Sequence, residues 1–186
     1  MPAEMKALLT VFLALAASAS GAAQTWSLST NTAGYADFGT LNAEAGYAFA
    51  RHWNASAGFR YNPFSFRSGG EPIHRRQRCF SAGLRYWPWH VYSGWWLSGR
   101  LQYQEYNFGG LRSPETREGE RIGGGVTAGY AYMLTPWLNL EAGLGLWTGW
   151  DRFTVYSCPV CGLTEERGRR LFLLPEDWQL TLRLIF

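Results

Sequence analysis

Apolar and polar residues alternate with a period of two along most of this chain, and no other feature limits its fold more strongly. In residues 138–146, for example, leucine and alanine at even positions alternate with Asn139, Glu141, Gly143 and Gly145. A helix would instead group its apolar residues every three or four positions. Comparable segments cover residues 26–29, 41–50, 53–61, 79–86, 95–104, 122–132 and 177–186. The pattern predicts an all-β protein.

Three details favour a membrane barrel over a soluble sandwich, which also alternates but turns its apolar face inward. The segments run for roughly ten residues, the length that a tilted strand needs to cross a bilayer. The residues opposite the apolar ones are mostly Gly, Ser, Asn, Gln, Glu and Arg, which suit a narrow polar lumen. The last segment ends in Phe186 and resembles the C-terminal signal that the barrel insertion machinery reads. We therefore predict an eight-stranded antiparallel up-and-down transmembrane β-barrel over residues 24–186.

The connections between segments predict which end of the barrel faces outward. Short turns near Arg51, Pro88 and Pro136 would lie in the periplasm, and longer connections at 63–77, 107–121 and 151–175 would lie outside. The first outer connection, near Asp37 to Thr40, is tight. Aromatic residues predict two interfacial girdles: Trp53, Trp87, Trp89 and Trp137 at the inner level, and Tyr61, Tyr103, Trp147 and Trp150 at the outer level.

The first 23 residues resemble a secretory signal peptide. Lys6 precedes an apolar run over 7–17, and small residues at 21–23 suit a cleavage site. The run is too short to span a bilayer, so we expect it to be removed and the barrel to reside in the outer membrane. The net charge of +3 is small and the arginines are scattered, which argues against a nucleic-acid partner.

Charged residues on the inward phase predict a network inside the barrel. An eight-stranded barrel is just wide enough to be filled by side chains, and charges buried there must pair. We therefore predict an ion-pair network that fills the lumen, with a narrow anion-preferring pore as the alternative because arginine is in excess. The residues are Glu44, Arg60, Arg85, Arg100, Glu141 and Arg183.

Cysteines and outer arginines offer two further sites. Cys158 and Cys161 form a C-x-x-C motif that favours a disulfide, although half a zinc site or a redox pair is also possible chemistry. Cys79 falls on the lumen phase and is interpreted as a small filler. Arginines in the outer connections suit the phosphates of lipopolysaccharide or a self-paired charged surface. No cofactor and no metal is expected.

Catalysis is not expected. His52 and His90 fall at the periplasmic end, and His74 lies in an outer connection without an evident serine neighbour. A rim enzyme acting on outer-leaflet lipid remains an alternative, which a rim His or Ser beside a carboxylate would favour.

Several short motifs in order resemble one family. They are Arg60-Tyr61-Asn62-Pro63-Phe64, Leu84-Arg85-Tyr86-Trp87, Gly129-Tyr130-Ala131-Tyr132, Trp137-Leu138-Asn139-Leu140-Glu141 and Cys158-Pro159-Val160-Cys161-Gly162. Together they resemble the family catalogued as domain of unknown function 3575, over nearly all of the mature chain. The resemblance implies a small outer-membrane protein, often encoded near fimbrial components, with no catalytic residues to carry over. We therefore expect a non-catalytic envelope anchor or an accessory to surface-fibre assembly that acts through its outer connections.

Overall fold

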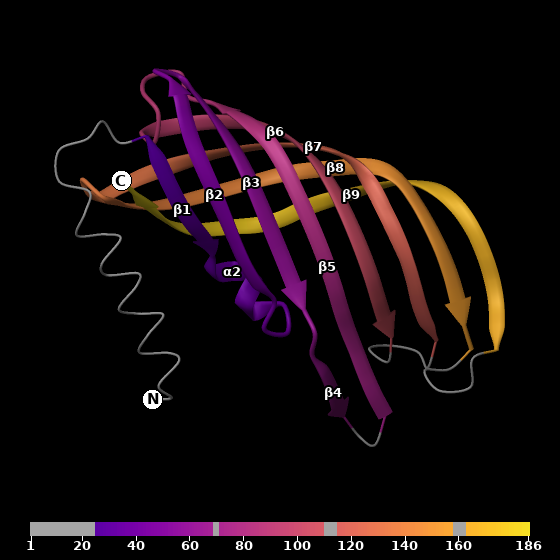
Figure 1. Ribbon diagram of the computed structural model, residues 1–186. Helices are drawn as coiled ribbons and strands as arrows, with labels where there is room; N and C mark the ends of the chain where they lie inside the picture. The colour runs from indigo at the N-terminus through magenta and orange to yellow at the C-terminus, as the bar shows by residue number, and fades with distance from the viewer. Residues whose placement is uncertain (1–24, 69–70, 110–114, 158–162) are drawn as a thin grey trace.

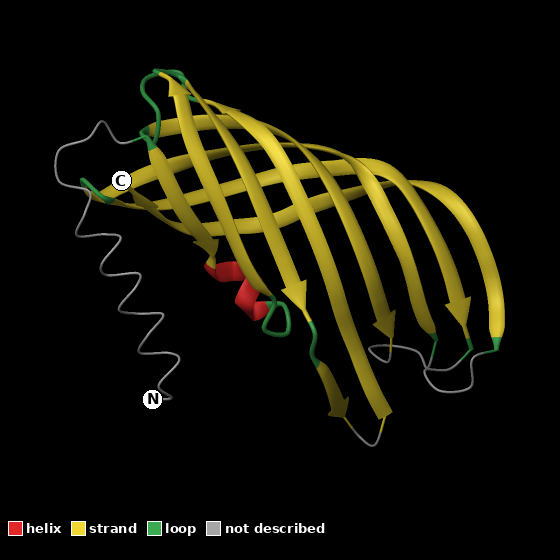
Figure 2. Cartoon of the chain, in the orientation of Figure 1, coloured by secondary structure: helices red, strands yellow, loops and turns green. Residues whose placement is uncertain are grey.

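The computed structural model describes residues 25–68, 71–109, 115–157 and 163–186. Almost all of these residues lie in strands, with one short helix (Figures 1 and 2). The elements are β1 (Trp26–Asn31), α2 (Thr32–Ala36), β2 (Leu41–Ala50), β3 (Trp53–Asn62), β4 (Ser65–Ser68), β5 (Glu71–Tyr86), β6 (Gly94–Gly109), β7 (Thr116–Thr135), β8 (Leu138–Tyr156) and β9 (Thr164–Ile185). The predicted signal peptide over 1–23 lies outside the described residues. Within the described part of the chain, no helix is long and apolar enough to cross a membrane.

Eight of the strands close into an antiparallel barrel. Neighbours follow the order β3-β2-β1-β9-β8-β7-β6-β5, and pairing of β3 with β5 completes the circle. Strand β4 is an additional short strand that pairs with the first residues of β5 beyond the end of β3. The eight-stranded up-and-down topology predicted from the alternation is thus confirmed.

The two ends of the barrel differ. One end, which we call the turn end, carries the short connections at 51–52, 87–93 and 136–137, and there the backbone of Trp26 bonds to that of Phe186. Toward the other end, β1 stops at Asn31 and β2 begins only at Leu41, whereas β5 to β9 continue. These continuing parts form an open wall (Figure 1), which we call the outer wall: residues 71–79, 104–109, 116–121, 151–156 and 164–170.

Helix α2 was not predicted, because the sequence indicated only a tight turn near Asp37 to Thr40. Asn31 begins the helix by accepting a hydrogen bond from the Ala33 N–H at 3.1 Å. The Asn31 side chain also bonds to Trp178 and Leu180 of β9. Asn31, the last residue of β1, thereby links the start of α2 to β9.

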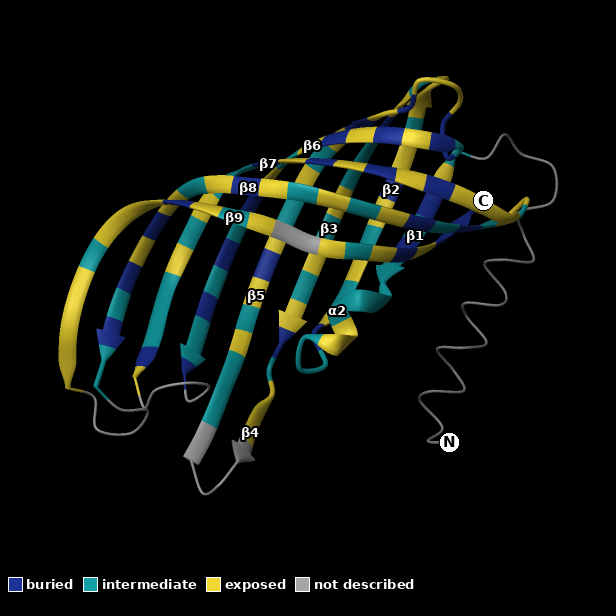
Figure 3. Ribbon diagram, turned by 180° about the vertical axis from the view of Figure 1, so that it is seen from behind, coloured by how far each residue is buried: buried dark blue, intermediate teal, exposed yellow. Residues whose placement is uncertain are grey.

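The expected long outer connections were wrong, since most of 63–77, 107–121 and 151–175 is strand. The reason is a change of polarity on the outward face along the same strands. In the closed barrel, outward residues such as Leu101 and Leu144 are apolar and exposed, and inward ones such as Glu141 are polar and buried. Figure 3 shows the alternation of exposed and buried residues along the strands. In the outer wall, outward residues such as Arg152 are charged, and the inward face is mixed, with Phe153 beside the buried Asp151. Because their outward residues are charged, such segments resemble polar loops in the sequence.

Candidate functional site

Five of the six predicted lumen charges meet in one cluster. Each comes from the inward phase of a different strand, and two glutamates lie among three arginines. Glu141 accepts from Arg85 at 2.7 Å and from Arg183 at 2.6 Å. Glu44 lies 2.9 Å from Arg183, 3.3 Å from Arg85 and 3.6 Å from Arg100. Glu141, Arg85 and Arg183 are almost fully buried, so the cluster fills the lumen at this level.

The sixth residue, Arg60, lies farther toward the outer wall. Its guanidinium donates to Gln102 Oε1 at 2.8 Å and approaches Cys79 Sγ at 3.5 Å. Cys79 is a buried free thiol at the lumen side of β5. A cavity of about 50 Å³ beside Glu44, Arg60 and Arg100 leaves room for little more than water.

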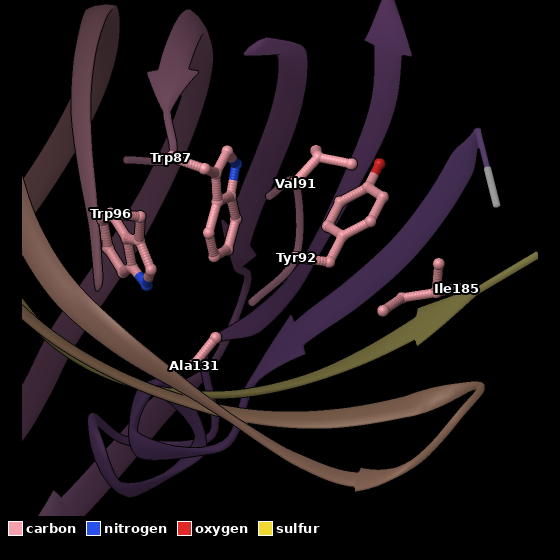
Figure 4. Close-up of a cluster of buried hydrophobic side chains, with 6 residues drawn as sticks. All are labelled: Trp87, Val91, Tyr92, Trp96, Ala131 and Ile185. Atoms are coloured by element: carbon pink, nitrogen blue, oxygen red, sulfur yellow. The ribbon is translucent and has the colours of Figure 1, made fainter. Parts of the chain in front are cut away.

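The connection between β5 and β6 fills the turn end of the lumen. Trp87, Val91 and Tyr92 of this connection are buried and pack with Trp96 of β6 (Figure 4). Ala131 and Ile185 complete the cluster, which we call the plug. The plug and the charge cluster contact each other, since the Arg85 guanidinium lies 4.1 Å from the centre of the Trp96 ring.

Buried hydrogen bonds hold the plug in place. The Trp87 indole N–H donates to Asn54 Oδ1 at 3.0 Å, and Asn139 Nδ2 donates to the Tyr92 carbonyl at 2.5 Å. Tyr92 adopts a positive φ of 67°, which costs energy for a non-glycine residue and therefore needs such support.

Two aromatic residues assigned to the girdles lie inside instead. Trp87 belongs to the plug and Trp147 is buried on the inward phase of β8, whereas Trp53, Trp89, Trp137 and Trp150 are exposed as expected. Trp87 follows the outward Tyr86 by one residue, so the alternation alone would have assigned Trp87 to the inward face.

A second buried carboxylate lies where the closed barrel gives way to the outer wall. Asp151 accepts from the Tyr106 hydroxyl at 2.8 Å and pairs with Arg170 at 3.2 Å and Arg121 at 3.4 Å. Arg121 also lies over the Tyr106 ring, 4.0 Å from its centre. Burial, together with the hydrogen bond to Asp151, raises the pKa of Tyr106 to about 12. This cluster was not predicted, because residues 151–175 were expected to form an outer connection.

Two hollows lie at the outer wall and beside it. The larger, about 710 Å³, is lined by residues from β3 and from β5 to β9, among them Arg76, Glu118 and Arg167. The smaller, about 510 Å³, is lined by Tyr103, Ile122 and Trp150 and by the charged residues Glu120, Arg121, Asp151, Arg152 and Arg169. Both hollows combine acidic and basic side chains, and the smaller one adds an apolar half.

Serine and histidine meet at the β4–β5 hairpin. Ser65 Oγ lies 3.1 Å from His74 Nδ1 and accepts from Arg76 Nε at 3.0 Å. Among the described residues, no carboxylate hydrogen-bonds to this histidine, which a catalytic triad would require. Cys158 and Cys161 lie outside the described residues, within which no group of three or more His, Cys, Asp or Glu could hold a metal.

The geometry defines a small closed barrel with a filled lumen and a one-sided wall. The chain belongs to the family described as protein of unknown function (DUF3575), whose model matches residues 8–186. No curated protein and no solved structure matches the chain.

Proposed function

We propose that this protein is a non-catalytic outer-membrane barrel, exported by a cleaved signal peptide, that anchors or assists surface-fibre assembly through its outer wall. The change of the outward face from apolar to charged residues along β5 to β9 carries the proposal. Outward Leu101, Leu144 and Val126 suit lipid tails, whereas outward Arg152 and Glu105 suit water and headgroups. In this orientation the turn end faces the periplasm, and the strand that ends at Phe186 is the segment recognised during insertion.

The filled lumen supports a contact role rather than transport. The plug occupies the turn end of the lumen, and the charge cluster contacts it. A hollow of about 710 Å³ lies instead at the outer wall. We therefore infer that partners, including lipopolysaccharide and fibre components, meet the protein at this wall.

Membrane insertion is tested by cell fractionation and heat modifiability. We expect the protein in the outer-membrane fraction, and the unheated detergent-solubilised form should migrate faster than the boiled form. A soluble protein whose two forms co-migrate would contradict the membrane assignment.

The contact role is tested by photocrosslinking in intact cells. A photoreactive residue at Arg167 of the outer wall should form adducts with a surface-fibre subunit, and one at Met133 near the turn end should not. Deletion of the gene should also reduce the number of fibres on the surface. Unchanged fibres and no fibre-subunit adduct from Arg167 would reject the accessory role.

An anion-preferring pore is less well supported, because both the plug and the charge cluster lie in its path. Planar-bilayer recordings of the purified protein should stay at the baseline. Steady anion-selective current steps whose size changes in the Trp87→Ala variant would favour the pore.

A rim hydrolase is the second candidate, and the 3.1 Å approach of Ser65 Oγ to His74 is the observation behind it. Release of fatty acid from outer-leaflet lipid that is lost in Ser65→Ala would favour this candidate over the anchor.

A further inference from the structure

Two adjacent rows of outward side chains cross the barrel at the level where the outward face changes from apolar to charged. Phe80, Tyr103, Ile122, Trp150 and Leu171 are cross-strand neighbours in one row. Two residues farther along each strand lies a charged row: Arg78, Glu105, Glu120, Arg152 and Arg169. An apolar row beside a charged row matches the boundary between lipid tails and headgroups.

Some residues of the charged row form ion pairs and others do not. Arg78 and Glu105 form an ion pair at 3.1 Å. Arg152 and Arg169, by contrast, form no ion pair with any residue that the structure describes, although both are exposed and adjacent across β8 and β9. Glu120 faces Arg152 from β7 but forms no ion pair with it. Among the described residues, the β8–β9 part of the row is therefore a pair of guanidinium groups without an ion-pair partner.

The hollow of about 510 Å³ joins these arginines to the apolar row. Tyr103, Ile122 and Trp150 line one part of it, and Arg152 and Arg169 line another. The remaining lining residues are Glu120, Arg121 and Asp151, and Asp151 is already paired with Arg121 and Arg170. Ile122 and Trp150 are each 61% exposed, so an acyl chain can lie against them. Guanidinium binds phosphate through two parallel hydrogen bonds, and neighbouring guanidiniums increase the local positive charge.

We propose that this hollow binds the phosphorylated sugar headgroup of an outer-leaflet glycolipid. Arg152 and Arg169 hold the phosphate, while the acyl chains follow Ile122, Trp150 and Leu171 into the bilayer. The inference rests on the proposed membrane orientation and adds to it a defined lipid site. A protein partner would not account for the apolar half of the hollow, because that half lies at the level of the lipid tails.

The test compares two lipids that differ only in phosphate. Purified, delipidated protein in detergent is titrated with bis-phosphorylated lipid A and with the same lipid after removal of its phosphates, and binding is measured by native mass spectrometry. We expect the wild type to prefer the phosphorylated lipid by roughly tenfold, a difference equivalent to about 1.4 kcal/mol. The double variant Arg152→Gln/Arg169→Gln should lose this preference, and Arg152→Lys/Arg169→Lys should retain part of it.

Arg51→Gln is the matched control, since Arg51 is an exposed arginine at the turn end. It should keep the wild-type preference. Equal binding of the two lipids by the wild type, or an unchanged preference in the double glutamine variant, would overturn the proposal. Displacement of the lipid by an equal concentration of inorganic phosphate would also overturn it, by assigning the arginines to free anions. Heat modifiability is recorded for each sample, so that failure of the lipid site is distinguished from failure of the membrane assignment.

Discussion

Each carboxylate in the lumen cluster serves at least two guanidinium groups. Glu141 is 1% exposed and pairs with Arg85 and Arg183, whereas Glu44 is 17% exposed and lies beside the small cavity. A buried charge that loses its partner cannot recover full hydration. The consequence of removing one carboxylate therefore depends on whether water can replace it.

We predict that Glu141→Gln lowers the free energy of unfolding by roughly 3–5 kcal/mol, the range for breaking a buried ion pair. Glu44→Gln should cost less, because water in the adjacent cavity can hydrate the arginines that remain. Urea titration of the detergent-folded protein, followed by heat modifiability, measures both. A larger loss in Glu44→Gln would contradict this ranking.

Tyr106 should make the stability of the protein depend on pH in the alkaline range. Its pKa of about 12 in the folded protein exceeds the ordinary value of 10, so the unfolded chain loses this proton first as pH rises. The resulting contribution to stability is complete below pH 10 and is lost as pH rises toward 12, by at most about 1.4 kcal/mol per pH unit. Tyr106→Phe should flatten this part of the pH profile. Phenolate absorbance and unfolding midpoints measured side by side would show whether it does.

At the scale of elements, the plug depends on glycines in the strands that face it. The Trp96 ring occupies the space over Gly129 of β7 and Gly143 of β8, where a β-carbon would come within 3 Å of the ring. The plug and the strands are therefore fitted to each other, and the fit is specific to the turn end of the barrel.

Gly129→Ala should consequently overpack the plug and destabilise the barrel by roughly 1–3 kcal/mol. A β-carbon there would meet both the Trp96 ring and the Ala142 carbonyl at 2.4 Å. Gly99→Ala on β6 is the control, because a β-carbon at Gly99 has no heavy atom within 4 Å. Comparable thermal midpoints for the two variants would show that Trp96 moves freely and that the fit is loose.

At the scale of the whole molecule, the same strands present two kinds of outward surface. The closed part turns leucine and aromatic residues outward, and the outer wall turns charged residues outward. Strand β8 contains both, with Leu144 in the apolar belt and Thr154 ten residues farther along on the same face. The position of the change along each strand sets how deep the barrel would sit in a bilayer.

Leu144→Arg should impair folding into lipid vesicles by roughly 2–4 kcal/mol if the belt faces lipid tails near the midplane. Thr154→Arg places the same side chain on the same face of β8, above the belt, and should fold almost as the wild type does. The folded fraction is read from the unheated form on a gel. Equal folding of both variants would show that the belt does not contact lipid tails.

The alternation alone sufficed to predict an all-β barrel of eight antiparallel strands, because parity along a strand is a local property. The inward phase likewise selected Glu44, Arg85, Arg100, Glu141 and Arg183 before their contacts were known. Parity would also have placed Trp87 inside, but its position near a turn led to its assignment to an interfacial girdle, which was wrong.

Tertiary structure decided what parity could not. Contacts between distant strands bring Arg85 and Arg183 together at Glu141. They also place Tyr106 and two arginines beside Asp151. The entry of the β5–β6 connection into the lumen depends on such contacts as well. The outer wall was also decided at this level, since a strand whose outward face is charged resembles a loop until its neighbours are known. The physical reason is that a sequence specifies which face a side chain takes, whereas its burial and its partners depend on the strands that pair beside it and across the lumen.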